Sequence, residues 1–526
     1  MVLEVNNMKQ ESTNATAQNT VNRAKIYQLV LFPMNNGATN VYYILTMNFI
    51  AYYANGVLGL LLAFATTMVT IMRVFDAITD PIIGAIMDRT STKWGKFRPF
   101  MVIGNVIMII SSILMYFGTR VISEDMMWLR YVCFVLFYAL YVIGYTFQTS
   151  VTRSGQTCLT NDPKQRPLFT IFNTVASLIG MGLVQFLAPL VTGGDYGSEK
   201  FFNIMIPLAI IVSAVMTVLS IIGIAGKDRP EYFGIGGDSA KEKVKVREYI
   251  QILGANKELQ RLMVAGAGCK LAFSIATNMT VLSMLYGAMM SDYGGLYLPM
   301  MIIGYVFSVP FFLLTVRTSQ KKGQKASLVF YVRIALIMYV GVLVLLFLWK
   351  PGVASVNLSL THINLYTVLF ILFFGIGYGA YYATADMPIP MVADCSDYET
   401  FRSGRYIPGI IGTLFSLVDK LVSSLGSTIV GLAVTAIGLS KLPDATTPYT
   451  DGMHGLVIIL FCVVPMIAWI ATLIAMHGYK LTGARMKEIQ AINAVRRDAV
   501  NKGMSIHDAL EKWKTIDQVP EEFIEK

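Results

Sequence analysis

The sequence predicts an all-α membrane protein with twelve transmembrane helices arranged in two sets of six. Of its 526 residues, 55% are hydrophobic and only 14% are charged, whereas soluble domains carry about 25% charged residues. Apolar runs of membrane-spanning length recur along the chain. Those of the first set cover residues 28–53, 57–87, 99–118, 128–152, 168–192 and 202–225, and those of the second cover 262–290, 296–316, 328–349, 364–392, 408–438 and 455–476. A polar segment around residues 226–260 separates the two sets.

The positions of the basic residues predict the orientation in the membrane. The net charge of +10 comes from Lys and Arg on alternate loops, such as Arg89–Arg98, the central polar segment and the C-terminal tail. Cytoplasmic loops carry an excess of these residues, so both termini and the central segment are expected in the cytoplasm. The first 25 residues lack the apolar core of a signal peptide, so the first span is expected to direct insertion. The basic charge reflects topology, and no nucleic-acid partner is expected.

These features divide the chain into five predicted parts. They are a polar cytoplasmic N-terminus (1–25), a six-helix bundle (26–225), a cytoplasmic central loop (226–260), a second six-helix bundle (261–477) and a cytoplasmic tail (478–526). Residues Lys243–Val264 have apolar residues at helical spacing, which fits either an interfacial helix or a solvated linker. In the tail, one helical stripe predicts a helix packed on the cytoplasmic face. The stripe consists of Met486, Ile489, Ile492 and Val495.

A short internal repeat predicts how the two sets are related. RTSTKWG (Arg89–Gly95) follows the second apolar run and RTSQKKG (Arg317–Gly323) follows the eighth, so each stands after the second helix of its set. Repeated loops at corresponding places favour two parallel halves related by an axis along the membrane normal, which is the architecture of the major facilitator fold. A solute and a coupling ion are then expected near mid-membrane, between the halves.

Three charged residues lie inside the second apolar run. Arg73, Asp76 and Asp80 follow one another at spacings of three and four, so they share one face of a helix. A charge at mid-bilayer costs about 2.5–3.5 kcal/mol on insertion scales, so these side chains are expected to face protein or a wet cavity. Pro81 has no amide to bond the Ala77 carbonyl, which leaves a further oxygen beside the acids. Hard cations bind such oxygens. The simpler interpretation is an internal ion pair between Arg73 and one acid.

Polar side chains of the first and fourth helices are the candidate solute ligands. Amides and phenols both donate and accept hydrogen bonds, which suits a hydroxylated solute, although hydrogen bonding between helices explains the same residues. Arg153 either grips an anionic group or lies at the cytoplasmic interface. The candidates are Asn36, Asn40, Tyr43, Gln148, Thr152 and Arg153, together with Arg73 on the second helix.

Charged residues recur in the second half, where each is costly without a partner. Lys270 lies early in the seventh helix, Asp386 deep in the tenth, and Asp419 and Lys420 are adjacent in the eleventh. We expect Lys420 to pair with Asp386 or Asp419, as a structural or a coupling ion pair. Asp386 and Lys420 are also candidates for solute binding.

No residue pattern indicates an enzyme. The five cysteines are scattered without metal-ligand spacing, and the four histidines form no HExxH. GIGYGA (Gly375–Ala380) lies inside an apolar run, where small residues permit close helix packing, so we reject a nucleotide-binding loop. Neither a nucleophile with its base nor a cofactor is predicted.

Three motifs resemble those of a known transporter family. DAITDPIIGAIMDRTSTKWGKFRPF (Asp76–Phe100) resembles the signature of the glycoside–pentoside–hexuronide:cation symporters, the melibiose-carrier-like branch of the major facilitators. NDPKQRPLF (Asn161–Phe169) and MVADCSDYETFRSGR (Met391–Arg405) look like the family's loop motifs after helices four and ten. The resemblance extends from about helix one to the tail. It implies solute uptake driven by a Na⁺, H⁺ or Li⁺ gradient through alternating access.

The resemblance also implies roles for single residues. Asp76 and Asp80 match the cation carboxylates, with Thr79 in a position that is often Asn. Lys420 matches the family's helix-eleven lysine near the cation and sugar sites.

The chain departs from the family's pattern at its sugar-binding positions. The helix-one acid is replaced by Thr39 or Asn40, the helix-four acid by Gln148, and the aromatic stacking positions by Thr152 and Ala385. The loss of two acids and the addition of Arg153 make the expected cavity less negative. A neutral galactoside is therefore disfavoured, and an anionic solute such as a uronide or a sulfonated sugar is favoured, with the family's lipid carriers as an alternative.

The sequence as a whole predicts a monomeric, cation-coupled symporter of a sugar-like solute in the cytoplasmic membrane of a prokaryote. Na⁺ or H⁺ is expected at Asp76, Thr79 and Asp80, and the solute between helices one, four, ten and eleven. The alternatives are an exporter or antiporter of amphipathic organic ions, and a membrane receptor or lipid-handling protein that transports nothing. The prediction fails if Asp76 and Asp80 face lipid, or if basic side chains lock them permanently.

Overall fold

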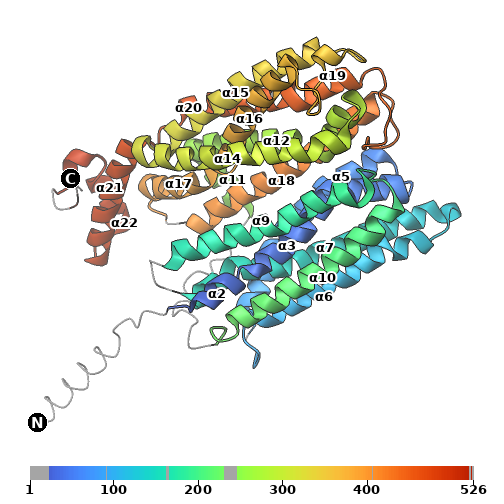
Figure 1. Ribbon diagram of the computed structural model, residues 1–526. Coiled ribbons are helices and arrows are strands. Elements are labelled where there is room, and N and C mark those ends of the chain that lie inside the picture. Colours follow the sequence, from blue (N-terminus) through green and yellow to red (C-terminus); the bar gives the residue numbers. More distant parts are fainter. Residues whose placement is uncertain are drawn as a thin grey trace, which may run out of the picture.

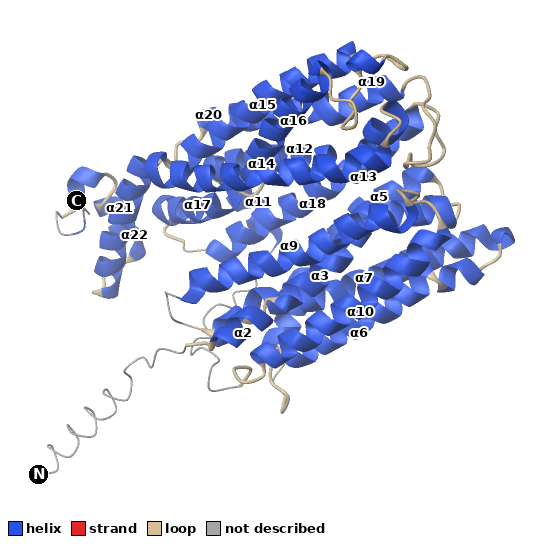
Figure 2. Cartoon of the chain, in the orientation of Figure 1, coloured by secondary structure: helices blue, strands red, loops and turns tan. Residues whose placement is uncertain are grey.

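The computed structural model describes residues 23–90, 92–160, 165–229, 246–405, 407–520 and 523. Within these ranges the regular structure is helical, apart from a single bridge between Thr92 and Gly95 (Figures 1 and 2). Long helices run roughly side by side in two bundles, and α2, near the start of the described chain, lies toward the same end of the molecule as α21 and α22, near its finish (Figure 1). We call this the terminal end. The opposite end, which carries residues 58–61, 193–198 and 437–452, is called the far end.

The first bundle contains the first six predicted spans. Its first span is not one regular helix, because π-helical turns interrupt it. The elements of that span are α2 (Ile26–Leu31), α3 (Met34–Ile44), η1 (Leu45–Phe49), α4 (Ile50–Tyr52) and η2 (Tyr53–Val57). The other five spans are α5 (Leu62–Arg89), α6 (Arg98–Tyr116), α7 (Met127–Ser154), α9 (Gln165–Thr192) and α10 (Glu199–Ile224). Short connecting helices are η3 (Gly118–Val121), η4 (Glu124–Met126) and α8 (Gln156–Leu159).

The second bundle contains the other six. Its elements are α12 (Lys257–Ala276), α13 (Met279–Leu282), η6 (Ser283–Met289), α14 (Tyr293–Lys322), α15 (Gln324–Leu348), α16 (Leu365–Thr384), α17 (Pro388–Ser403), α18 (Pro408–Ala436), α19 (Met453–Val457), η8 (Ile458–Val463) and α20 (Val464–Gly478). The short elements outside these spans are α11 (Val246–Ala255), η7 (Ala354–Val356), α21 (Gly483–Asn501), α22 (Ile506–Lys512) and η9 (Ile516–Gln518).

The helices agree with the predicted spans. In the described part of the chain, ten helices are long and apolar enough to cross a membrane, and the pair from Lys257 to Met289, bent by 45°, makes an eleventh. The one remaining predicted span, which is the first in the sequence, is the interrupted run from Ile26 to Val57. The first span departs from a regular helix at Pro33 and at the two π-helical stretches, Leu45–Phe49 and Tyr53–Val57.

Hydrogen bonds join the two bundles at the far end. The Tyr52 hydroxyl donates to the Pro443 carbonyl over 2.6 Å, and the Tyr196 and Tyr293 hydroxyls lie 2.6 Å apart. Deeper in the molecule, α5 packs along α18, where the Thr70 hydroxyl donates to the carbonyl of Ser424 over 3.0 Å. The far end is therefore closed, and the α5–α18 contact extends this closure into the middle of the molecule.

The repeated loop motif has a common structural feature in the two halves. Gly95 and Gly323, the last residues of the two copies, have φ angles of 105° and 87°, which glycine adopts far more readily than other residues. The next helix begins soon after each glycine, at Arg98 and at Gln324. The first copy is a turn after α5, whereas the second forms the last turn of α14.

The predicted tail helix is confirmed. α21 packs against α17, and the four predicted apolar stripe residues of the tail are buried. At the central loop, the helical alternative for residues 243–264 holds from residue 246 onward, because α11 and then α12 cover that segment. Residues 230–245 of this loop lie outside the described residues.

Candidate functional site

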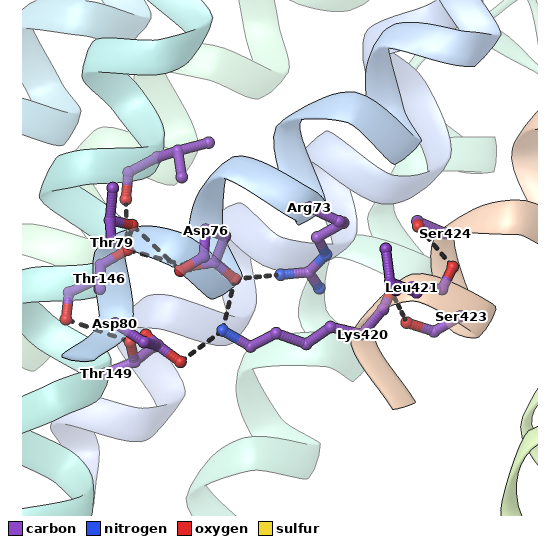
Figure 3. Close-up of polar contacts among 11 residues, drawn as sticks. Arg73, Asp76, Thr79, Asp80, Thr146, Thr149, Lys420, Leu421, Ser423 and Ser424 are labelled. Atoms are coloured by element: carbon purple, nitrogen blue, oxygen red, sulfur yellow. Dashed lines mark hydrogen bonds and ion pairs between the residues drawn. The ribbon is translucent and has the colours of Figure 1, made fainter. Parts of the chain in front are cut away.

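Four charged side chains meet between the two bundles. Arg73, Asp76 and Asp80 come from α5, and Lys420 comes from α18 of the other half (Figure 3). The Lys420 ammonium lies 2.8 Å from Asp76 Oδ2 and 2.6 Å from Asp80 Oδ2. Arg73 Nη1 lies 3.1 Å from the same oxygen of Asp76. The helical spacing of the three α5 residues turns them toward α18, as the single-face pattern requires.

The cluster is shielded from lipid. The side chain of Asp76 is 1% exposed, and those of Lys420, Arg73 and Asp80 are 11%, 12% and 16% exposed. Asp76 lies about midway along α5, so the acids occupy the depth at which an unpaired charge costs most. Acids that faced lipid would have excluded a cation site, and Asp76 and Asp80 do not face lipid.

The ion pairs differ from those expected from the sequence. The simpler interpretation paired Arg73 with one acid, but in the structure Lys420 neutralises the second. The expectation that Lys420 pairs with Asp386 or Asp419 is wrong, since its ammonium crosses to the acids of α5. The four described side chains of this cluster, two positive and two negative, sum to a net charge of zero. A cation that enters adds a positive charge, which favours the departure of a positive side chain.

Oxygen atoms surround the Asp76 carboxylate. The Thr146 hydroxyl donates to Asp76 Oδ1 over 2.9 Å, and the Thr79 hydroxyl donates to the Asp76 carbonyl over 3.0 Å. The two hydroxyl oxygens lie 3.2 Å apart. Pro81 lies within the continuous α5 and cannot bond the Ala77 carbonyl. Carboxylate, hydroxyl and carbonyl oxygens are the donors that hard cations prefer, so this set is chemically suited to Na⁺ once an ammonium leaves.

A small cavity adjoins the charged cluster, and we call it the tyrosine cavity because four of its ten lining residues are tyrosines. Its volume is about 20 Å³, which is room for one ordered water. The Arg73 guanidinium lies over the rings of Tyr43 and Tyr145, 4.7 and 5.9 Å from their centroids. Sequence reasoning singled out neither Tyr138 nor Tyr141, which also line the cavity. With Tyr145 they are spaced three and four residues apart on α7, so the three tyrosines share one face of the helix. This spacing in the sequence could have identified them.

The other predicted ligands of the first half make hydrogen bonds within their own bundle. Asn36 Nδ2 donates to the Asn173 carbonyl on α9 over 3.3 Å, and Asn40 Nδ2 donates to Asn36 Oδ1 over 3.0 Å. The Thr39 hydroxyl donates to the Asn36 carbonyl over 2.9 Å. These contacts hold the three side chains along α3, beside α9.

Gln148 and Thr152 lie in a second polar group, inside the first bundle. Gln148 is fully buried, and its Nε2 donates to the Met101 carbonyl over 3.1 Å and to the Thr217 hydroxyl over 3.0 Å. Asn35 Nδ2 donates to the Thr152 hydroxyl over 2.7 Å. Neither Gln148 nor Thr152 lines the tyrosine cavity. Arg153 belongs to α7, and its side chain lies outside the described part of the structure.

Asp386 belongs to a separate charged cluster in the second half. It lies at the break between α16 and α17, and its Oδ1 is 2.7 Å from the ammonium of Lys270 on α12. Asp419 Oδ1, on α18, is 3.8 Å from the same ammonium. The sequence identified each of these charges but not the pairs that they form.

Comparisons with known proteins agree with this architecture. The profile of the family described as MFS/sugar transport protein matches residues 32–483. The putative glycoside/cation symporter YagG of Escherichia coli is 26% identical over 479 residues, which are 88% of this chain and 93% of that protein. The glucuronide carrier protein homolog of E. coli is 24% identical and covers 88% of this chain and 94% of its own. A lactose permease of Lactobacillus helveticus is 21% identical over 88% of this chain and 70% of its own.

Solved structures show the same fold. The xylose transporter XylE from E. coli, in a partially occluded inward open conformation, matches with a TM-score of 0.52 and 14% identity, over 85% of this chain and 97% of its own. A bacterial homolog of the human lysosomal transporter Spinster, inward-facing and unoccupied, matches with a TM-score of 0.53 and 14% identity, over 87% and 97%. The chain therefore belongs to the MFS/sugar transport protein family, in its glycoside–pentoside–hexuronide:cation symporter branch, and is a multi-pass secondary transporter with the major facilitator fold, not an enzyme.

Proposed function

We propose that this transporter is a symporter, in which Na⁺ or H⁺ drives the uptake of a glycoside, a uronide or a related sugar by alternating access. One observation carries the proposal. The acids of α5 are buried between the two halves and are held there by Lys420 of the opposite half. A bond that joins two moving halves is sensitive to their separation, so a cation that replaces Lys420 biases the conformational equilibrium.

A cation site also requires that basic side chains do not lock Asp76 and Asp80 permanently. Replacement of Lys420 by a cation meets this requirement. Asp76 and Asp80 are paired with basic side chains, but the Lys420 ammonium sits on a long flexible stem from the other half. Alternating access moves α18 relative to α5, which breaks the bond by geometry alone. We propose that the cation binds Asp76 and Asp80, with Thr79 beside them, in the state in which Lys420 has left.

The solute is proposed to bind against the tyrosine cavity and Arg73. Aromatic faces pack against sugar rings, and a guanidinium binds carboxylate or sulfonate groups in a bidentate manner. The cavity, at about 20 Å³, is smaller than a sugar, so solute entry requires the halves to separate next to Tyr43 and Arg73. The names of the glucuronide carrier homolog and of the glycoside/cation symporter are consistent with a sugar-like or uronide solute.

The proposed setting is the cytoplasmic membrane, with a monomeric chain and both termini in the cytoplasm. The basic loops at the terminal end support this orientation through the positive-inside rule. Under this orientation the closed far end faces the outside of the cell, so the structure corresponds to a state closed to the outside.

Uptake into proteoliposomes tests the proposal. The purified chain is reconstituted, an inward Na⁺ or H⁺ gradient is imposed, and radiolabelled galactosides, glucuronides and sulfonated sugars are supplied. Gradient-dependent accumulation of one class is expected, and Asp76→Asn or Asp80→Asn should abolish it. Asp397→Asn is the matched control, because Asp397 lies on α17 and its carboxylate accepts a bond from Gln490 over 3.4 Å, outside the central cluster.

Three other outcomes would contradict the proposal. Unchanged coupling in both acid variants would remove the cation assignment. Export driven by the opposite gradient would make the protein an antiporter. Solute binding without translocation would indicate a receptor.

A further inference from the structure

The cluster of Lys270, Asp386 and Asp419, here called the second cluster, has no role in the function proposed so far. It brings together α12, the break between α16 and α17, and α18. The Lys270 side chain is 18% exposed, whereas those of Asp386 and Asp419 are 68% and 32% exposed. The basic member is therefore largely buried, while both acids keep oxygen surface open to a further partner.

The two clusters carry different net charges. Around Asp76, two positive and two negative side chains sum to zero. In the second cluster, one positive and two negative side chains sum to −1. Lys270 lies close to Asp386 at 2.7 Å but only at 3.8 Å from Asp419. Asp419 is thus the less fully neutralised of the two acids.

The backbone connects the clusters directly. Asp419 is the residue before Lys420 on α18, and the two side chains leave the helix toward different clusters. A Na⁺ ion added beside Asp76 and Asp80 would raise the net charge of their buried cluster from zero to +1. Lys420 is the positive side chain that belongs to the other half, so repulsion favours its departure. Its ammonium then needs another acid, because an unpaired charge within the membrane is costly.

We propose that the second cluster receives the ammonium of Lys420 when a cation occupies the site of Asp76 and Asp80. This inference rests on the proposed function and adds a role for residues that it leaves unused. Asp419 and Asp386 are positioning residues, which act on the cation through Lys420 and do not touch it. The transfer leaves the second cluster neutral and detaches α18 from the acids of α5. Cation binding thereby weakens the contact between the halves.

The competing interpretation is that these ion pairs only fasten α12 to the α16–α17 break and to α18. A structural role predicts changes in stability without a specific change in Na⁺ affinity. A general electrostatic effect of the second cluster on Na⁺ predicts a change in affinity that does not need Lys420. A double-mutant cycle with Lys420→Met separates the three possibilities.

The experiment measures Na⁺ binding to the purified full-length chain by the rise in thermal midpoint as NaCl replaces choline chloride at constant ionic strength. Asp419→Asn should weaken Na⁺ binding about tenfold, the equivalent of about 1.4 kcal/mol. Lys270→Met should strengthen it, because the receiving acids lose their present partner. If Asp419→Asn does not fold, Asp386→Asn provides the same test, since its carboxylate is 68% exposed.

In the Lys420→Met background, both effects should disappear, because no ammonium remains to be received. Asp397→Asn should change nothing in either background. If Asp419→Asn and Lys270→Met shift the Na⁺ affinity equally with and without Lys420, the second cluster acts on Na⁺ through its general electrostatic field, and the proposal is overturned. Unchanged Na⁺ affinity in Asp419→Asn and Lys270→Met would establish a purely structural cluster. An absence of Na⁺ binding by the wild-type protein would overturn this inference and leave H⁺ as the coupling ion of the proposed function, whereas the absence of uptake under either gradient would overturn the proposed function itself.

Discussion

The Lys420→Met substitution removes the ammonium that joins the two halves while keeping most of the side-chain volume. Lys420 lies 2.8 Å from Asp76 and 2.6 Å from Asp80, and the substitution leaves Arg73 as the one basic member of the four described side chains of the cluster. The charged cluster then changes from a net charge of zero to −1. Two consequences follow. The sodium-free protein becomes less stable, and the acids bind a cation that no longer competes with an ammonium.

The size of the effect follows from burial. None of the three side chains that form these ion pairs is more than 16% exposed, so screening by water is limited. Removing one partner of a buried ion pair costs about 3–5 kcal/mol. If Na⁺ recovers about half of that free energy, its Kd falls by about 10- to 100-fold, since each 1.4 kcal/mol is a factor of ten. Gradient-driven uptake should be lost, because the cation no longer alternates with an ammonium of the other half.

The assay is thermal unfolding of purified protein during replacement of choline by Na⁺. For Lys420→Met the midpoint should lie below that of the wild type in choline and recover in Na⁺, at lower Na⁺ concentrations than the wild type needs. Lys321→Met serves as the control, because Lys321 is exposed in the last turn of α14. An equal loss of stability in both salts, with no gain in Na⁺ affinity, would refute the view that Lys420 occupies the place of a cation.

Three further substitutions test the fold and the far-end closure. Asp228→Ala removes a buried carboxylate that accepts hydrogen bonds from three backbone amides at the start of α6, over 2.8, 3.0 and 2.9 Å. Denaturant titration should show that the free energy of unfolding falls by at least about 3 kcal/mol. Gly180→Leu should reduce the folded yield and the thermal midpoint, since a Cβ at residue 180 would lie 2.2 Å from the Gly37 carbonyl oxygen on α3. Tyr52→Phe removes the donor to Pro443 and should favour opening of the far end by about 1 kcal/mol, seen as about fivefold faster maleimide labelling of the Leu442→Cys variant.

Matched controls exist for two of these substitutions. A Cβ at residue 182 would contact only the Phe186 ring, at 3.8 Å, so Gly182→Leu should be tolerated. Equal loss of stability in Gly182→Leu would show that the α3–α9 contact is not the reason why residue 180 must be glycine. Tyr53→Phe removes a hydroxyl that donates to Tyr116 within the first bundle. Its labelling rate should match that of the parent, and an equal acceleration would show that the far end responds to any tyrosine loss.

Most of the fold could be predicted because the signals are local. Twenty or so apolar residues must form a helix in a bilayer, which satisfies its own backbone, so composition alone places the spans. The predicted run 408–438 compares with α18 at Pro408–Ala436, for example. The π-helical breaks of the first span were not predictable in the same way. Hydropathy reports how apolar a segment is, and it contains no information about the local winding of a helix.

The sequence identifies the charged residues of the candidate site but not the ion pairs that they form. Spacing along one helix fixes which face Arg73, Asp76 and Asp80 share, because that geometry repeats every 3.6 residues. The partner of Asp80 is 340 residues away, and several basic and acidic residues of the second half satisfy the same requirement for charge compensation. Adjacent Asp419 and Lys420 point about 100° apart on an α-helix, so in this structure their side chains reach different neighbours. Only the arrangement of α12 and α5 on either side of α18 decides that Lys420 meets the acids of the first half and Asp419 meets Lys270.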